Sequence, residues 1–531
     1  MDTLLSLVTG ERAKNSTWDA VQAWYAASAK NDAHKDGTHR FVPTRLLDVS
    51  EHHTPSAFEN LKLITDTSKC YGGYATLSHR WGSCQHFCTS TANLESHCRG
   101  VRPGTLPKTF QDAITVTRIM GVKYLWIDAI CIVQDDLQDW KHESLMMAEV
   151  YGNAAFNIAA HSAGSDEAGF LSDLLFQKKR KRLWGEETTR PKITDFETLV
   201  DHSPLSSRGW VFQERILSPR ILHFVNDILF WEDGRGVWAQ DGSHTDCSGW
   251  RSNWKKHRIQ SDWYRLMEIY STLNLTYEKD RLHAVEGLVG QLQEWTGANY
   301  CAGMWLDSIY QGLLWRPGKT LTSSSRGAHN TLFPSWSWAS CSGPILFPDK
   351  LANLVPVASG IRFTTSLDNQ DTNPTKSPEL TQGCLVMRAH IKCMAGLTAK
   401  FDNACETSFV LLGPLPSWSI YPPGQAKFGR RIGWLTLDEG NEPPDFSNLW
   451  CALIAIRIPM YDAVSGCMQC ETDSDHLKFH IEPTSVRFLC CLILSATDVK
   501  ERRFRRVGIG KFYETSWFAT KDSDVAVITL E

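Results

Sequence analysis

The sequence lacks the glycine-rich loops with which two large classes of nucleotide-binding proteins hold phosphates. No G-x-G-x-x-G pattern follows a candidate strand, and no G-x-x-x-x-G-K-[ST] pattern is present. These absences argue against a Rossmann dehydrogenase and against a P-loop nucleotide switch. The G-x-S-x-G elbow of α/β-hydrolases is missing as well.

Charge and hydrophobicity exclude further classes of partner. A formal net charge of −4 gives no bulk attraction to nucleic acid, and we expect the basic run at residues 178–182 to be a solvated loop. No apolar stretch is long enough to cross a bilayer, so no membrane span is expected. The first residues lack the basic, apolar and cleavage regions of a secretory signal, which predicts a cytoplasmic protein.

The 16 cysteines are scattered over the chain, so we expect reduced thiols, most of them in the core. Zinc needs four well-placed ligands. The pair Cys467 and Cys470 supplies half a site, and a second group has no regular paired spacing: Cys84, His86, Cys88, His97 and Cys98. We expect no metal site, although metal binding by the second group stays open.

Alternating helix and strand patterns between residues 74 and 224 predict an α/β core. Apolar residues recur at helical spacing from Phe110 to Met120, with Pro107 in the first turn and Gly121 at the end. A second helix is expected from Trp140. Runs typical of buried strands lie at residues 74–77, 122–127, 155–160 and 221–224. Strands alternating with helices predict a parallel sheet with right-handed crossovers.

Polar residues follow the predicted strands directly. Ser78, His79 and Arg80 close the first strand, Asp128 closes the second, and Ser162 follows the third. Ligands bind at the carboxyl ends of the strands in such sheets, so we expect these side chains to gather on one rim.

Five blocks of the sequence resemble the fungal heterokaryon incompatibility (HET) domain and occur in that family's order. They are YATLSHRWG at 74–82, LPKTFQDA at 106–113, YLWIDAICIVQDD at 124–136, Glu143-Ser144 with Met147 and Tyr151, and RGWVFQER at 208–215. The resemblance covers residues 70–225. Later segments, including PSWSWAS at 334–340, resemble the region that commonly follows this domain. One difference is Ser78-His79-Arg80, where many members carry an aromatic residue and a cysteine.

The HET domain is distantly similar to the Toll/interleukin-1 receptor (TIR) domain, in which a glutamate supports cleavage of the nicotinamide glycosidic bond of NAD. The resemblance therefore implies a TIR-like (flavodoxin-like) parallel sheet, Glu214 as the catalytic residue, and NAD as a possible substrate, with no bound cofactor. The expected ligand-binding residues are Ser78, Arg80, Trp81, Asp128 and Trp210. Bond cleavage develops positive charge on the ribose, which a nearby carboxylate stabilises, and the leaving nicotinamide is neutral and needs no general acid.

Each role has a structural alternative. Glu214 is also expected to form an ion pair with Arg208, Arg215 or Arg220, and the tryptophans to lie in the core. Asp128 is expected to cap the turn that follows it.

Other acidic residues are expected to be structural. Glu143 is expected on the helix surface or in its first turn, and Asp135 and Asp136 in a solvated turn. Ser78, His79 and Asp128 have the residue types of a hydrolytic triad, but the sequence does not place them within hydrogen-bond reach.

Pattern changes along the chain predict four regions. They are an N-terminal helical and loop region at 1–69, the HET domain at 70–225, a helical annex at 226–343 with helices at 254–273 and 301–314, and a β-rich C-terminal domain at 344–531. The resemblance implies a cell-death effector of non-self recognition, activated by self-association or by another incompatibility protein. The alternative is a non-enzymatic signalling or scaffold protein that uses the α/β domain for self-association.

Overall fold

A computed structural model describes fifteen stretches of the chain, which divide into two compact units. The described residues are 16–29, 41–50, 61–70, 73–82, 87–171, 193–246, 259–318, 332–348, 354–364, 383–402, 417–422, 431–438, 444–457, 488–513 and 524–531. Unit 1 comprises Met1–His257, Leu273–Thr276 and His283–Gln291; unit 2 comprises Arg258–Thr272, Tyr277–Leu282 and Leu292–Glu531. The four regions expected from the sequence remain a proposal.

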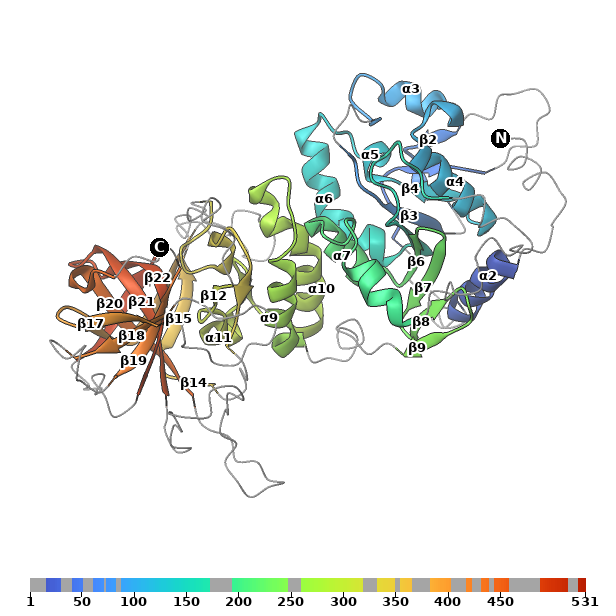
Figure 1. The fold of residues 1–531 in the computed structure, drawn as a ribbon. Coiled ribbons are helices and arrows are strands. Elements are labelled where there is room, and N and C mark those ends of the chain that lie inside the picture. Colours follow the sequence, from blue (N-terminus) through green and yellow to red (C-terminus); the bar gives the residue numbers. More distant parts are fainter. Residues whose placement is uncertain are drawn as a thin grey trace, which may run out of the picture. The chain divides into compact units, whose positions relative to one another are not determined.

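A nine-stranded mixed sheet forms the centre of unit 1 (Figure 1). Its strand order is β2-β1-β4-β3-β5-β6-β7-β8-β9. The strands are β1 (Leu46–Asp48), β2 (Lys62–Ile64), β3 (Tyr74–Ser78), β4 (Tyr124–Trp126), β5 (Phe156–Ala160), β6 (Arg220–Val225), β7 (Ile228–Asp233), β8 (Gly236–Ala239) and β9 (His244–Asp246). Four neighbouring strands, β4, β3, β5 and β6, run parallel, as their apolar sequences predict. The sheet as a whole is mixed, because β1 pairs antiparallel with β4, and β7 with β6.

Helices cover both faces of this sheet. They are α2 (Ser16–Ala29), α3 (Leu94–Arg99), α4 (Lys108–Ile119), α5 (Asp128–Cys131), α6 (Leu137–Gly152) and α7 (Gly209–Leu217). Tyr25 of α2 packs on Phe156, and Phe110 of α4 packs on His79. On the other face, the Tyr74 hydroxyl donates to the carbonyl of Val150 in α6, and Val211 of α7 joins a cluster with Ala159.

Strand alternation places a row of polar side chains on the face beneath α6 and α7. The pairing register puts Ser78 opposite Ala159, Ala159 opposite His223, and Ile221 opposite Glu232. Because paired residues share a face and the side-chain period is two, these positions share it with Thr76 and Asn157. All the polar members of this row are buried, so each needs a hydrogen-bond partner within the protein.

Local chemistry sets the ends of the helices around the site. The Asp136 carboxylate accepts hydrogen bonds from the backbone N–H groups of Gln138 and Asp139, which starts α6 ahead of the expected Trp140. Gly121, with φ of 73°, follows α4. The first residue of α7 is Gly209. A side chain does not fit at this position, because a Cβ there would lie 2.5 Å from Cδ2 of Leu275.

Unit 2 begins with helices around a tryptophan-rich core. The helices are α9 (Ile259–Tyr270), α10 (Glu286–Thr296), which the division into units cuts, and α11 (Ile309–Gly312). The helix expected at 301–314 was wrong for its first half. Tyr300–Cys301 (β10) and Met304–Trp305 (β11) form a hairpin instead, in which Ala302 and Gly303 have positive φ angles that a helix excludes. The Trp338 indole donates to the carbonyl of Gly303 at 2.8 Å.

The C-terminal part of unit 2 is β-rich, as predicted. Two short strands, β12 (Arg316–Pro317) and β13 (Ile345–Leu346), pair with each other. The large sheet contains β14 (Leu354–Pro356), β15 (Ser359–Thr364), β16 (Cys384–Cys393), β17 (Thr398–Asp402), β18 (Ser417–Tyr421), β19 (Gly433–Leu437), β20 (Leu449–Arg457), β21 (Phe488–Asp498), β22 (Arg503–Tyr513) and β23 (Val525–Leu530). Five of these strands, β16, β20, β21, β22 and β23, pair in a closed cycle. Closure removes unpaired edges from this part of the sheet.

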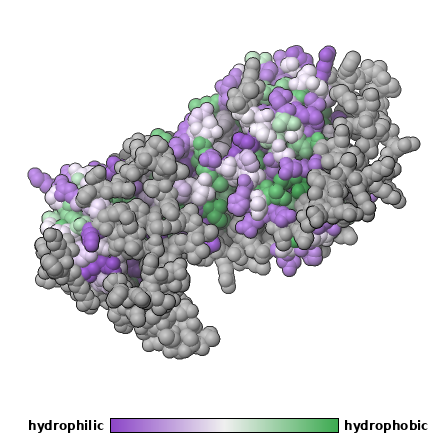
Figure 2. Space-filling view, in the orientation of Figure 1, coloured by the Kyte–Doolittle hydropathy of each residue, from purple (hydrophilic) through white to green (hydrophobic). Residues whose placement is uncertain are grey.

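No helix in the described stretches is long and apolar enough to cross a membrane. On the face drawn in Figure 2, hydrophobic residues of the described part form small patches between hydrophilic ones.

Candidate functional site

Glu214 and Ser78 form the centre of the candidate site. Ser78, the last residue of β3, donates its hydroxyl hydrogen to Oε2 of Glu214 in α7. The Asn157 amide of β5 donates to Oγ of Ser78 at 2.9 Å, and Thr76 donates to the Asn157 amide oxygen at 3.1 Å. The Asn157 amide therefore occupies one of the two lone pairs of Ser78 Oγ, and the hydroxyl hydrogen points to Glu214.

The Glu214 carboxylate lies in a buried and electrostatically mixed environment. The residue is only 5% exposed. Burial raises the pKa of Glu214, while the Ser78 hydrogen bond and the positive charge of Arg208 oppose that rise. Tyr151 of α6 lies beside the pair, and its hydroxyl donates to the carbonyl of Leu77 at 3.3 Å. Burial raises the pKa of Tyr151 well above its ordinary value, so this hydroxyl stays protonated.

The three arginines expected to neutralise Glu214 have other partners. Arg208 donates to the carbonyl of His79, Arg215 pairs with Asp201 and Glu232, and Arg220 donates to Ser28. None of the three forms a direct ion pair with Glu214. The carboxylate is therefore held by a hydroxyl, with Arg208 acting on it only through space.

Asp128 and Trp81 contact each other at the rim of the sheet. The Trp81 indole donates to Oδ2 of Asp128 at 3.0 Å, while Oδ1 accepts from the backbone N–H of Ala129 at 2.8 Å, at the start of α5. The Trp81 ring stacks on His79 with an interplanar angle of 12° and a centroid distance of 6.3 Å. Asp128 is the first residue of α5, whose N-cap is Ile127, so the expected capping role is not what the structure shows. Its carboxylate instead accepts from the next backbone N–H and positions an aromatic ring.

The combination Ser78, His79 and Asp128 does not form a triad. Ser78 and His79 point to opposite faces of the sheet because they are consecutive residues at a strand end. His79 lies 3.7 Å from Oδ1 of Asp128 and 3.2 Å from Oδ1 of Asp166, whereas Ser78 bonds Glu214 and Asn157. The serine therefore has no histidine base.

The remaining expected ligand residues lie around this centre. Arg80 is half-buried and makes no hydrogen bond or ion pair with any residue in the described part of the chain. Trp210 is half-buried and packs edge-to-face on Trp140 of α6, with ring centroids 6.5 Å apart. Ser162 is engaged elsewhere, since it bonds the backbone of Phe224 and Asn226.

A small cavity lies behind Ser78, beneath α7. Its volume is about 10 Å³, enough for a single water molecule. Ser78 and Asn157 line one side, and His161, Ser206, Arg215 and His223 are among the residues that line the rest. Glu214 does not line this cavity, and its side chain is nearly covered.

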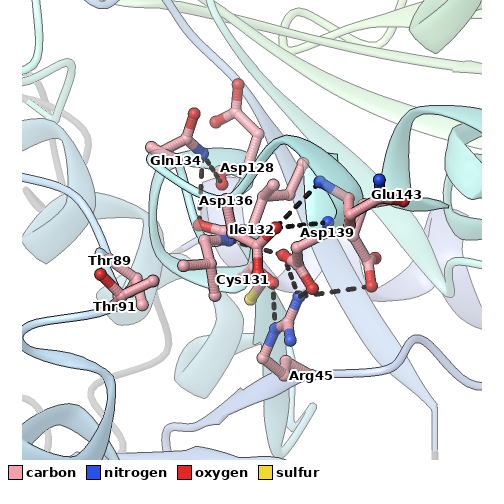
Figure 3. Close-up of polar contacts among 12 residues, drawn as sticks. Arg45, Thr89, Thr91, Asp128, Cys131, Ile132, Gln134, Asp136, Asp139 and Glu143 are labelled. Atoms are coloured by element: carbon pink, nitrogen blue, oxygen red, sulfur yellow. Dashed lines mark hydrogen bonds and ion pairs between the residues drawn. The ribbon is translucent and has the colours of Figure 1, made fainter. Parts of the chain in front are cut away.

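Glu143 is buried, and its expected place on the helix surface was wrong. Its side chain is 1% exposed and lies 3.4 Å from Arg45, which also pairs with Asp139 at 2.5 Å and donates to the carbonyl of Cys131. Figure 3 shows Arg45 entering between Asp139 and Glu143 of α6. The partner residue, Arg45, lies outside the HET-like blocks, directly before β1, so these blocks gave no indication of the contact. The Glu143 block therefore serves to attach α6 to the N-terminal segment.

The other acidic candidates and His97 have structural contacts. Asp135 accepts hydrogen bonds from the backbone and hydroxyl of Thr91, and Asp136 caps α6, as expected for turn acids. His97 bonds the Thr89 hydroxyl at 2.9 Å. The described residues contain no group of three or more metal-ligand side chains, but Cys84, His86, Cys467 and Cys470 lie outside them.

Sequence reasoning missed Asn157 and Tyr151 as members of the site. Asn157 carried a usable signal, because an amide inside a buried strand must find a partner on its own face. Tyr151 was noted only as part of the Glu143 block, and its hydroxyl position follows from the packing of α6 on β3.

The fold and the site together define an α/β domain with a buried acid at the carboxyl ends of parallel strands. Residues 74–214 match the family model described as Heterokaryon incompatibility protein (HET), and this part of the chain is a HET domain. The family implies a role in heterokaryon incompatibility. No curated protein and no solved structure matches the chain.

Proposed function

We propose that this chain is an effector of programmed cell death in fungal non-self recognition, whose HET domain cleaves NAD between nicotinamide and ribose. The observation that carries the proposal is the buried Glu214 carboxylate, held by Ser78 at the carboxyl end of the parallel strands. A charge of this kind is retained in a protein interior at an energetic cost, and such groups concentrate at functional sites.

The topology supports a ligand site at this position. Numbered in chain order, the four parallel strands β3 to β6 have the spatial order 2-1-3-4, the order in which flavodoxin-like sheets begin. In such sheets ligands bind where the strand order reverses, which here is between β3 and β5. Ser78 and Asn157 lie on these two strands. This agreement supports the TIR-like interpretation.

The proposed reaction is hydrolysis of NAD to nicotinamide, ADP-ribose and a proton. The bond between ribose C1′ and the nicotinamide nitrogen breaks, and its electron pair leaves with nicotinamide. The ribose becomes positively charged, and the Glu214 carboxylate stabilises it. A water then adds to C1′ and loses its proton.

The rim offers groups for the rest of the substrate. Arg80, without a protein partner in the described part, is the cation proposed for the diphosphate. The half-buried rings of Trp81 and Trp210 are proposed to contact the nicotinamide and adenine rings of NAD. Asp128 orients the Trp81 ring through their hydrogen bond.

The burial of Glu214 makes activation part of the proposal. Glu214 is 5% exposed, so NAD requires a rearrangement around the rim to reach it. Self-association, or binding to another incompatibility protein, would supply the free energy for that change. A cytoplasmic location belongs to the same proposal.

The test is nicotinamide release from NAD by purified protein at high concentration, for wild type and Glu214→Gln. The matched control is Glu143→Gln, since Glu143 is also buried but contacts Arg45 instead of Ser78. Folding of all three proteins is checked by circular dichroism and thermal unfolding. Release by wild type and Glu143→Gln, with a loss of at least about 100-fold in Glu214→Gln, is expected. Equal rates in all three folded proteins would overturn the role of Glu214.

A second candidate function is a scaffold that associates without catalysis. Its supporting observation is the burial of the Glu214 carboxylate, which is only 5% exposed. Cell death after expression separates the candidates. The scaffold predicts equal toxicity for wild type and Glu214→Gln, whereas the enzyme predicts that this variant is harmless.

A further inference from the structure

Four buried side chains beneath α7 form a continuous hydrogen-bonded chain, which we call the histidine chain: Ser203, His161, His223 and Glu232. The Ser203 hydroxyl lies 2.7 Å from Nδ1 of His161, and Nε2 of His161 lies 2.9 Å from Nδ1 of His223. Nε2 of His223 lies 2.9 Å from Oε2 of Glu232. All four residues are buried, so their protons exchange with partners inside the protein.

The carboxylate at one end determines where the protons lie when both rings are neutral. Glu232 only accepts, so His223 must carry its hydrogen on Nε2, and its Nδ1 is then an acceptor. His161 consequently donates from Nε2, and its Nδ1 accepts from the Ser203 hydroxyl. Every hydrogen bond points toward Glu232 in this state.

The same geometry accommodates one additional proton. With His223 protonated on both nitrogens, its Nδ1 donates to His161, which then donates from Nδ1 to Ser203. The Ser203 hydroxyl turns to Oγ of Ser206, 3.2 Å away, while Ser206 donates to the carbonyl of Val200 at 2.6 Å. The two states differ by one proton that enters from the Ser206 side, and neither leaves two acceptors facing each other.

Charged side chains pack against one end of the histidine chain. Arg215 of α7 pairs with Glu232 of β7 and with Asp201 of η6 (Glu197–Asp201), and Glu232 also bonds His223. The Phe196 ring packs edge-on against His223 at 5.4 Å. Burial, followed by the charges of His223 and Arg215, lowers the pKa of His161. Geometry assigns the added proton to His223, because its Nε2 lies 2.9 Å from Oε2 of Glu232.

The cavity of about 10 Å³ connects this chain to the Glu214 site. It is lined by Ser78, which bonds Glu214, and by Asn157, which bonds Ser78, together with Ser206, His161 and His223. A water there would have polar neighbours on both sides. Ser206 is also the point at which a proton enters the histidine chain.

We propose that the histidine chain is the proton acceptor of the Glu214 site and takes up the proton released when water adds to the ribose. The proposal rests on the NAD-cleaving function proposed above. The proton passes from the attacking water to Glu214, then through Ser78 and the cavity water to Ser206 and Ser203, and finally to the histidines. His161 and His223 contact no substrate, so they act on the reaction only through Glu214, as acceptors of its proton.

The first test measures the proton itself, without any activity. Histidine ¹⁵N NMR of the full chain is followed against pH for wild type and Glu232→Gln, which keeps an oxygen acceptor for His223 but removes the charge. The control is His244→Gln on β9, whose ring stacks on Trp238. In wild type, His161 and His223 should titrate together with uptake of one proton, and in Glu232→Gln this titration should move about 1 to 3 pH units lower. Independent titrations, or an unchanged pKa in Glu232→Gln, would overturn the proton chain.

The second test measures the link to Glu214. The ¹³C signal of the Glu214 carboxyl carbon should respond to the titration of the histidine pair, and this response should shift in Glu232→Gln. If NAD is hydrolysed, kcat of Glu232→Gln should fall about 10- to 100-fold with KM unchanged. An unaffected carboxyl signal and kcat would reject the link. If wild type releases no nicotinamide, the NAD function fails, and the two NMR measurements still decide between a connected proton chain and a purely structural network.

Discussion

The Ser78 hydroxyl donates a hydrogen bond to the Glu214 carboxylate, although the two residues are 136 positions apart in the sequence. The contact joins the end of a parallel strand to a helix that enters the same edge of the sheet. Both partners are buried, so the properties of the acid depend on this neighbour.

The first prediction concerns the pH dependence of folding stability. Burial raises the pKa of Glu214 in the folded protein, so its contribution to stability is fully present below the unfolded-state pKa of about 4.3 and is lost as pH rises through the folded-state value. Glutamine does not ionise, so the Glu214→Gln variant does not lose this contribution as pH rises. The free energy of unfolding of the variant, minus that of wild type, should therefore increase from about pH 4 to about pH 8.

Urea unfolding at a series of pH values measures this difference. Glu149→Gln is the matched control, because Glu149 is an exposed glutamate on α6. Its difference from wild type should change little with pH. A constant difference for Glu214→Gln as well would contradict the raised pKa.

The second prediction concerns Arg45, the cation between Asp139 and Glu143. Arg45→Ala should lower the free energy of unfolding by about 3 to 5 kcal/mol, because it leaves Glu143 buried without a partner charge. Arg99→Ala breaks an exposed pair with Glu95 and should cost at most about 1 kcal/mol. Urea unfolding of unit 1, followed by tryptophan fluorescence, makes the comparison, and similar costs for the two variants would show that Arg45 is not stabilising.

The third prediction uses two glycine-to-alanine substitutions with opposite expected signs. Gly303 has φ of 93°, and a Cβ there would lie 2.5 Å from Nε1 of the buried Trp338. Gly303→Ala should therefore destabilise by at least about 1 to 3 kcal/mol. Gly290, inside α10, has open space at its Cβ position, so Gly290→Ala should stabilise by about 0.5 to 1 kcal/mol. Thermal unfolding of both variants checks the signs, and a neutral Gly303→Ala would refute the hairpin geometry.

The fourth prediction concerns Arg506 in the β-rich part of unit 2. Its guanidinium is fully buried, lies 3.0 Å from Oδ1 of Asp438 and stacks over Trp315 at 3.5 Å. Burial lowers the pKa of Arg506 to about 10, so it remains a cation at neutral pH. Arg506→Ala should lower the free energy of unfolding by about 3 to 5 kcal/mol. Arg503, on the same strand as Arg506, forms an exposed pair with Glu531, so Arg503→Ala should lower it by at most about 1 kcal/mol. Denaturant unfolding compares them, and a small cost for Arg506→Ala would mean that water replaces the lost pair.

The sequence alone determined the parallel core, the family and the position of the rim. Residues 122–127 and 155–160 are short, largely apolar runs typical of doubly covered strands, and the helices between them favour parallel pairing. The turn residues Asp135 and Asp136 were also assigned correctly, because hydrogen bonding in a turn is local.

The tertiary structure decided which side chains meet. Ser78 and His79 are neighbours in sequence but belong to opposite faces, and the face of Ser78 depends on pairing with β5. Glu143 is buried because Arg45, 98 residues earlier, reaches it. The histidine chain combines residues from β6, β7 and two loops, and no local pattern predicts their contact. Short-range periodicity encodes the elements, whereas register and packing bring distant polar groups together, and the candidate site is built entirely from such contacts.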